Sequence, residues 1–342
     1  MTSQSIPALV LRRLLQAIPA LAGIVIVTFI LTRALPGDPA ALFAGPTADE
    51  KSIEEVRKNL GLSEPLHTQF LLYVKALAHG DLGRSITTGQ NVGQELIRRI
   101  PASLELTLLA LMISVSVAVP LGVMAATRPN SWIDHLCRVT VSTGVSLPPF
   151  FTGLAFIALF YVFLGLTPAP IGRLNVLFSP PPHVTGLYVI DALLAGDLKL
   201  ARAAFSQLLM PACTLALFTA APIARMARGA MLQILASDFV RTARAAGLRR
   251  GTVLWTYAFR NATLPVITTF GMVFSFTLGA NVLVEKVFSW PGLGSFAVDA
   301  LVSSDYAAVQ GFVLAMAVIF VLLNLTIDVV YLLIDPRVRI DA

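Results

Sequence analysis

Residues 237–265 read SDFVRTARAAGLRRGTVLWTYAFRNATLP, and together with the residues just before them they separate two long uncharged runs. The segment from Arg225 to Pro265 holds a single acid, Asp238. Against it stand the arginines Arg225, Arg228, Arg241, Arg244, Arg249, Arg250 and Arg260. Basic residues of multi-pass membrane proteins gather in loops on the cytoplasmic side. The imbalance therefore predicts a cytoplasmic loop between two membrane spans.

The middle of this stretch has the signals of two short helices that meet at a glycine. Ser237 is placed as a helix N-cap, and Gly247 follows an alanine-rich turn as the left-handed residue that ends the helix. A second helix is expected to start near Thr252. The result would be a compact knob whose backbone another protein can approach closely, although an ordinary basic loop would have the same charge.

The composition of the chain defines its class. Of 342 residues, 56% are hydrophobic and 13% charged, which is too apolar for a soluble domain of this size. We therefore predict an all-α polytopic membrane protein. The net charge of +6 does not indicate a nucleic-acid partner, because the basic residues lie in loops between apolar runs. Two cysteines and four scattered histidines predict neither a metal site nor a cofactor.

Uncharged runs predict six transmembrane helices. The first lies between Arg13 and Arg33 and is long enough to cross a hydrocarbon core of about 30 Å. A cleaved signal peptide is the alternative for this run, but no A-x-A type cleavage site follows it. The other runs are 106–127, 139–172, 203–224, 261–284 and 306–327. The third contains Pro148 and Pro149, which predict an early kink, and its helix is expected to end before Pro168.

Residues 34–100 differ from the rest of the chain because their acidic and basic residues balance. Apolar residues have helical spacing over 54–60 and 66–78, and 80–93 is rich in turn residues. We expect a small extracytoplasmic subdomain here. The predicted organisation is a cytoplasmic N-terminus and first span (1–33), this subdomain (34–100), and a core of five spans (101–342) that includes the cytoplasmic loop 225–261.

An even number of spans places both termini on one side of the membrane. With the termini in the cytoplasm, the inner segments hold Arg12, Arg13, Arg128, Arg138, the arginines of the quoted stretch, Arg337 and Arg339. The inner acids are fewer, namely Asp134, Asp238, Asp328, Asp335 and Asp341. The positive-inside rule therefore favours cytoplasmic termini.

The sequence lacks the motifs of an enzyme. It contains no G-x-x-x-x-G-K-[ST], no convincing triad of Ser, His and acid, and no paired carboxylates in a believable pocket. If ATP drives transport through this chain, the energy must enter from another subunit at a cytoplasmic surface. The knob from Asp238 to Arg250 is the candidate of sufficient size.

Polar residues within or beside the spans are candidates for the translocation pathway. Asn324 and Asp328 share one face of the last span, Asn281 lies near the outer end of the fifth, and Glu285 lies just beyond it. An acid in a span is a functional candidate by default, but packing and hydrogen bonding between helices are the favoured interpretation for these residues. Pro148 and Pro149 supply a bend that could act as a hinge.

Several phrases, taken in order, resemble the dipeptide, oligopeptide and nickel branch of ABC-importer permeases. These are LPGDPA (35–40), GDLGRSI (80–86), SLPPFFTGL (146–154), PACTLAL (211–217), TARAAGL (242–248), RNATLPV (260–266), VEKVFSWPGLG (284–294) and NLTIDVVYLLIDPRVR (324–339). The resemblance implies a type I ABC importer permease in the inner membrane. It also implies a second, homologous permease chain, two ABC ATPase subunits and an extracytoplasmic solute-binding protein for peptides or related small solutes.

In such importers the knob, called the EAA loop, docks into a groove on an ATPase subunit. Carried over to this sequence, the contact falls on residues 242–248, within the coupling set Asp238, Arg241, Thr242, Ala243, Arg244, Ala245, Ala246, Gly247, Leu248, Arg249 and Arg250. Two departures from the general pattern put any particular ion pair in doubt. Thr242 stands near the place of the usual glutamate, and Ala246 stands where a lysine is often seen.

Two other classes of protein fit the sequence less well. A self-contained secondary transporter or channel would be expected to show charged relay residues near the membrane midplane or inverted repeats, and neither is evident. A membrane sensor or scaffold that uses residues 34–100 as a receptor would need an output domain, which the short C-terminal tail does not provide.

Overall fold

A computed structural model describes residues 6–34, 39–45, 48–59 and 61–334. Within these residues every regular element is a helix, and β-structure is limited to one isolated antiparallel bridge between Arg84 and Asn91. The chain divides into two compact units, one of residues 1–100 with 295–342 and the other of residues 101–294. Much of the LPGDPA phrase and the tail from Asp335, with Arg337, Arg339 and Asp341, lie outside the described residues.

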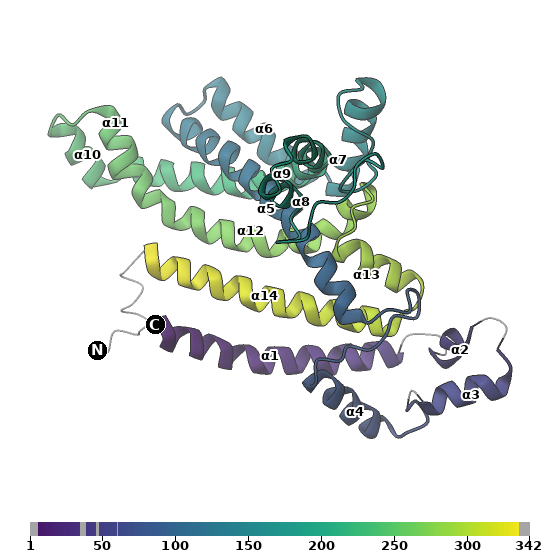
Figure 1. The fold of residues 1–342 in the computed structure, drawn as a ribbon. Coiled ribbons are helices and arrows are strands. Elements are labelled where there is room, and N and C mark those ends of the chain that lie inside the picture. Colours follow the sequence, from purple (N-terminus) through teal and green to yellow (C-terminus); the bar gives the residue numbers. More distant parts are fainter. Residues whose placement is uncertain (1–5, 35–38, 46–47, 60, 335–342) are drawn as a thin grey trace. The chain divides into compact units, whose positions relative to one another are not determined.

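The first unit contains two long helices that lie side by side, α1 (Ile6–Ala34) and α14 (Tyr306–Ile334) (Figure 1). Gln310 donates to Thr32 Oγ1 at 2.6 Å, and Arg13 pairs with Asp328 at 2.9 Å. The shorter helices of this unit are α2 (Pro39–Ala44), α3 (Glu50–Asn59), α4 (Leu66–Ala78) and most of α13 (Leu293–Val302). Helix α4 has the bounds that the sequence predicts.

A turn-rich segment joins α4 to α5 (Val92–Thr127), as expected from its glycines. Asp305, which is fully buried, fixes this segment by accepting hydrogen bonds from Ser85 Oγ at 2.6 Å and from the backbone N–H of Thr87 at 3.2 Å. The other oxygen of the same carboxylate accepts from the backbone N–H of Ala308 at 3.2 Å, in the first turn of α14. One side chain therefore holds both a turn and a helix start.

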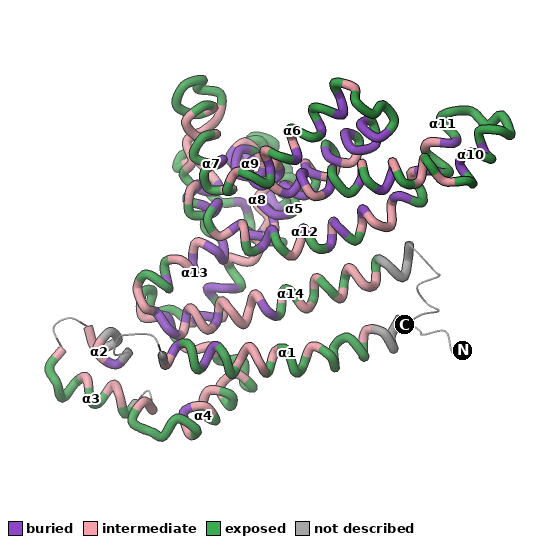
Figure 2. Tube along the Cα trace, turned by 180° about the vertical axis from the view of Figure 1, so that it is seen from behind, coloured by how far each residue is buried: buried purple, intermediate pink, exposed green. Residues whose placement is uncertain are grey.

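The second unit is built around α9 (Leu198–Leu235), which packs against α12 (Arg260–Val287), α6 (Trp132–Ser146), α8 (Tyr188–Leu194) and α7 (Pro149–Phe156). Because α9 is surrounded by these helices, many of its residues are buried (Figure 2). Two glycines allow the close approach: a Cβ on Gly122 would lie 2.8 Å from the carbonyl oxygen of Ala224, and one on Gly144 would lie 2.5 Å from that of Leu217. Both contacts join helices far apart in sequence.

Among the described residues, five helices are long and apolar enough to cross a membrane, and the count rises to six if one bent pair is a single span. The bent pair is α6 followed by α7 and the π-helical η1 (Ile157–Phe163), which meet at 107°. Helix α7 begins at Pro149, and Pro148 precedes it with an extended backbone, so the predicted kink is in fact a sharp turn between two helices. The second helix ends at Phe163, before Pro168 as predicted.

Candidate docking site

The segment between α9 and the next long helix forms an exposed projection, residues 236–250, which we call the elbow. Its helix α10 (Asp238–Ala245) begins after Ser237, whose extended backbone matches the predicted N-cap position. The predicted capping hydrogen bond is absent, because the Ser237 hydroxyl donates to the Ile234 carbonyl at 2.6 Å instead. The position of the helix start was therefore correct and its stabilising contact was not.

Gly247 ends α10 as predicted. Its φ is +77°, a backbone conformation that costs a side-chain-bearing residue energy and costs glycine none. The N–H of Leu248 reaches back to the Ala243 carbonyl at 3.3 Å, and the N–H of Gly247 donates to the Arg244 carbonyl at 3.0 Å. These contacts satisfy carbonyls that the end of a helix leaves free.

The second helix of the elbow differs from the prediction. It begins at Arg250, within two residues of the predicted start, but it is not short. The helix α11 (Arg250–Thr252) continues through a π-helical segment, η2 (Val253–Phe259), into α12 without a break, so that one helical rod of 38 residues runs from Arg250 to Val287. No residue between Thr252 and Pro265 has the chemistry to stop it.

The inner face of the elbow is a small apolar contact. Val240 is fully buried and Ala243 is 6% exposed, and both pack with Val253 of the rod and with Ile234 and Leu235 of α9. Ala243 therefore points into the chain, although the resemblance placed it within the docking segment. Its side chain holds the elbow against the long helices.

The outer face of the elbow carries the remaining residues of the predicted coupling set. They are exposed: Asp238, Arg241, Thr242, Arg244, Ala245, Ala246, Gly247, Leu248, Arg249 and Arg250. Asp238 and Arg241 form an ion pair one helical turn apart, and such exposed pairs contribute little to stability. The methyl groups of Ala245 and Ala246 leave the backbone at the end of α10 open to close approach.

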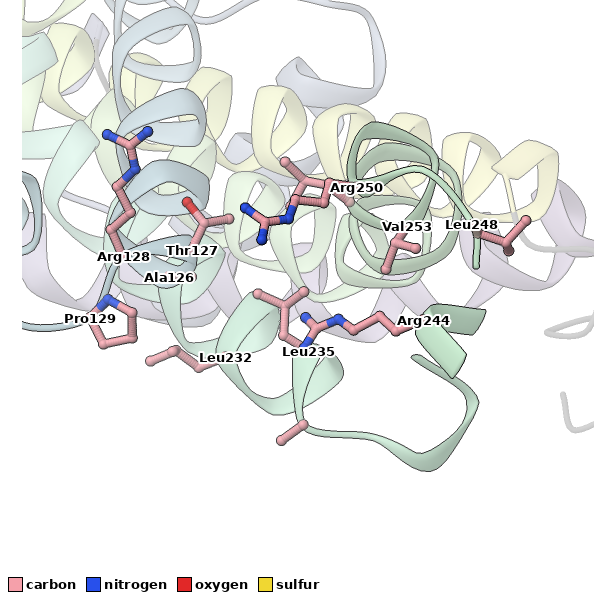
Figure 3. Close-up of a pocket in the computed structure, with 12 residues that line it drawn as sticks. Ala126, Thr127, Arg128, Pro129, Leu232, Leu235, Arg244, Leu248, Arg250 and Val253 are labelled. Carbon is pink, nitrogen blue, oxygen red and sulfur yellow. The ribbon is translucent and has the colours of Figure 1, made fainter. Parts of the chain in front are cut away.

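A cavity of about 870 Å³ lies beside the elbow (Figure 3). Its walls come from the end of α5, the end of α9 and the start of the rod, and its lining residues include Arg128, Arg244 and Arg250 but no acid among the part of the chain that the structure describes. In Figure 3 the Arg250 side chain extends towards Thr127 and the Arg244 side chain towards Leu235. The site is thus apolar at its walls and cationic at its edge.

Sequence reasoning missed the role of Asp134, which it counted as a loop acid. Asp134 is completely buried and accepts hydrogen bonds from Arg228 Nε at 2.5 Å and from Arg138 at 2.5 Å. Arg228 accordingly lies inside α9 and ties it to α6, and is not a free charge of the quoted stretch. The partners are far apart in sequence, so no local pattern could have joined them.

At the opposite end of the rod, Asn281 and Glu285 form a buried polar cluster. Glu285 lies inside α12 and not beyond the helix, and it is fully buried. Its carboxylate accepts from Ser103 Oγ at 2.5 Å, from Asn281 Nδ2 at 3.0 Å and from the backbone N–H of Gly294 at 2.8 Å. Asn281 Nδ2 also lies 3.3 Å from Thr107 Oγ1. These contacts match the favoured interpretation of packing and hydrogen bonding.

The phrase WPGLG (290–294) folds over this cluster. Trp290 Nε1 donates to the Ala102 carbonyl at 2.9 Å, and the indole is 1% exposed. A Cβ on Gly292 would overlap the Glu285 carboxylate, and a Cβ on Gly294 would overlap Val282. Neither position has room for a side chain, so both require glycine.

The other pathway candidates lie elsewhere. Pro148 and Pro149 stand at the 107° turn between α6 and α7. Asn324 and Asp328 line a cavity of about 180 Å³ with Arg13, in which Asp328 pairs with Arg13. That ion pair joins α1 to α14, in line with the interhelical role favoured for Asp328.

The described part of the chain is helical and holds five or six candidate spans, as expected of a multi-pass membrane protein. The family described as binding-protein-dependent transport system inner membrane component matches residues 118–340, and the N-terminal component of the same systems matches residues 7–107. The chain belongs to this family, and it is a permease subunit of an ATP-binding-cassette importer that works with other subunits.

Individual relatives agree with the family. The probable D,D-dipeptide transport system permease protein of Escherichia coli is 44% identical over 317 residues, 93% of each chain. A dipeptide transport system permease protein of Alkalihalophilus pseudofirmus is 39% identical over 97% of this chain and 99% of its own length. A di/tripeptide transport system permease protein of Pseudomonas aeruginosa is 41% identical over 96% and 97%.

Proposed function

We propose that this permease forms one half of a pathway for short peptides and that its elbow receives the force of ATP hydrolysis from a separate ATPase subunit. The observation that carries the proposal is the two-sidedness of the elbow. Val240, Ala243 and Val253 fix it to the long helices from within, while Ala245, Ala246 and the arginines around them remain exposed. Such a surface suits a partner that binds the elbow and displaces it together with the helices to which it is fixed.

The rod supplies a route from the elbow to the pathway. Since the helix continues from Arg250 to Val287, a displacement of its first turn is carried along a length of about 57 Å. The last turns of the rod carry the buried residues Asn281 and Glu285. In this mechanism the elbow moves the rod, and the buried cluster transmits the movement to α5 through Ser103.

The proposed assembly contains a second, homologous permease, two ATPase subunits that hydrolyse the ATP, and an extracytoplasmic binding protein that delivers the substrate. The elbow and both termini face the cytoplasm, as the distribution of arginines favours. Short peptides are the proposed cargo because the relatives named above are permeases of dipeptide, D,D-dipeptide and di/tripeptide transport systems.

The chain offers a matched pair of sites to test docking. Ala246 and Ala195 both follow the last residue of a helix with nearly the same backbone angles, both are exposed, and both precede a left-handed glycine. Ala246→Glu is expected to reduce recovery of the ATPase subunits with the tagged permease at least about tenfold, as one lost hot-spot residue does. Ala195→Glu should leave it unchanged. Equal recovery with both variants would contradict docking at the elbow.

Transport itself is tested in liposomes. The complete assembly with its binding protein should accumulate a radiolabelled dipeptide only when ATP is present on the elbow side. The permease alone should not accumulate it with a proton or sodium gradient. Uphill uptake by the chain alone would favour a secondary transporter instead.

A further inference from the structure

Helix α4 is attached to α1 through one face. Phe29 of α1 makes an edge contact with Phe70, with ring centroids 5.3 Å apart, and a stacked contact with Tyr73 at 5.9 Å. Four residues further along α1, Arg33 Nε donates to Gln69 Oε1 at 2.8 Å. Figure 1 shows α4 against the C-terminal part of α1.

These contacts indicate the depth of α4 relative to the membrane. Arg33 is the first charge after the apolar run of α1, so it marks the boundary of the hydrocarbon core. Phe29 precedes it by one helical turn and therefore lies about 6 Å inside that boundary. Since Phe70 and Tyr73 contact the Phe29 ring, α4 lies at the membrane boundary and not in the water beyond it.

Outside this contact, α4 exposes several aliphatic side chains. Leu71 is 65% exposed, Leu72 50% and Val74 39%, and Leu66 at the start of the helix is 63% exposed. Lys75 is the one charged residue between Leu66 and Ala78. Helix α3, in the same segment, is instead dominated by charged residues, as expected of a helix in water. The two helices therefore suit different surroundings.

We propose that α4 is an interfacial helix whose Leu71, Leu72 and Val74 insert among the lipids of the leaflet at the C-terminal end of α1. Helices of this kind bury an apolar face about 5–10 Å into the headgroup and acyl boundary. Lys75 can extend its ammonium group to the phosphates while its methylenes stay among the apolar side chains. Ile30 of α1, next to Phe29 in the sequence, is exposed as well. A protein partner over this face is the competing occupant.

The test uses an environment-sensitive fluorophore on single cysteines. Leu71→Cys and Val74→Cys, each in a background with Cys137→Ser and Cys213→Ser, are labelled in the whole importer in phosphatidylcholine and phosphatidylglycerol nanodiscs. Ser52→Cys on α3 is the matched control, since Ser52 is exposed on a charged helix. Each labelled importer is accepted only if it retains its assembly.

Lipids with a nitroxide near the headgroup should quench the labels on α4 at least about threefold more than the label on α3, because quenching requires contact with the lipid. Equal quenching at both helices would overturn the proposal. A blue-shifted emission at position 71 without lipid quenching would also overturn it, since it would indicate a protein surface over α4. Neither outcome depends on the identity of the cargo or on docking at the elbow.

Discussion

The two ends of the rod from Arg250 to Val287 are held in opposite ways. At the far end, Glu285 is buried among specific donors, and neighbouring glycines leave no room for a methyl group. At the elbow, a few apolar contacts support an exposed surface whose arginines outnumber its one acid. The charge at the far end is satisfied by hydrogen bonds within the chain. The charges at the elbow are exposed, so they are available to a partner. Substitutions at the two ends should therefore affect different measurements.

The largest effect is expected from Gly292→Ala. The added methyl group would overlap the Glu285 carboxylate and force apart a buried, charged network, so the free energy of unfolding should fall by about 3 kcal/mol or more. Thermal unfolding of the purified permease measures the loss. Gly251→Ala is the control at the elbow end, because a Cβ there has nothing within 4 Å. Similar melting temperatures for the two variants would contradict the packing described for Gly292.

Glu285→Gln should have a smaller effect. It keeps the shape of the side chain but replaces one acceptor oxygen with a donor that faces Ser103 or the Gly294 N–H. A buried donor without an acceptor costs about 1–3 kcal/mol, which chemical denaturation of the protein in detergent can resolve. Recovery of stability by a second change, Ser103→Ala, would show that the Ser103 hydroxyl causes part of the loss. No loss in the single variant would show that the cluster does not need its charge.

Gly247→Ala in the elbow has a matched control in Gly196→Ala, which lies between α8 and α9. Both glycines have φ near +75° and nothing within 4 Å of an added Cβ, so each change should cost about 1–2 kcal/mol through backbone strain alone. Only Gly247→Ala should also lower peptide-stimulated ATPase activity of the assembly. Equal activity of the two variants would separate the elbow from coupling.

The smallest effect is expected from Asp238→Asn. It breaks an exposed ion pair with Arg241, which should change the free energy of unfolding by less than about 0.5 kcal/mol. The released arginine should instead make association with an acidic partner surface more sensitive to salt, as measured by binding at increasing ionic strength. A large loss of stability would show that the pair supports α10.

Local signals made much of the fold predictable. The uncharged runs located the spans, the spacing of apolar residues gave α4, and Gly247 marked the end of α10, because each of these depends on residues close in sequence. The prolines at 148 and 149 indicated a break, but they carry no information on its angle of 107°. The predicted coupling residues were found exposed except Ala243, whose burial depends on Val253.

Long-range contacts could not be predicted. Asp134 lies 94 residues before its partner Arg228, and Glu285 lies 182 residues after its partner Ser103. Nothing near either acid in the sequence identifies its partner. The continuous rod was missed because the helix predicted to start near Thr252 was expected to be short and separate from the following span, although no glycine or proline lies between Thr252 and Pro265.

The Asp305 carboxylate stabilises two elements, because it accepts hydrogen bonds from Ser85 and Thr87 in the turn and from Ala308 at the start of α14. Insertions or deletions between Gly80 and Asn91 consequently have a second cost, since they withdraw donors from a side chain on which a distant helix also depends. Variation in the length of this turn should be tolerated only together with a new residue at position 305.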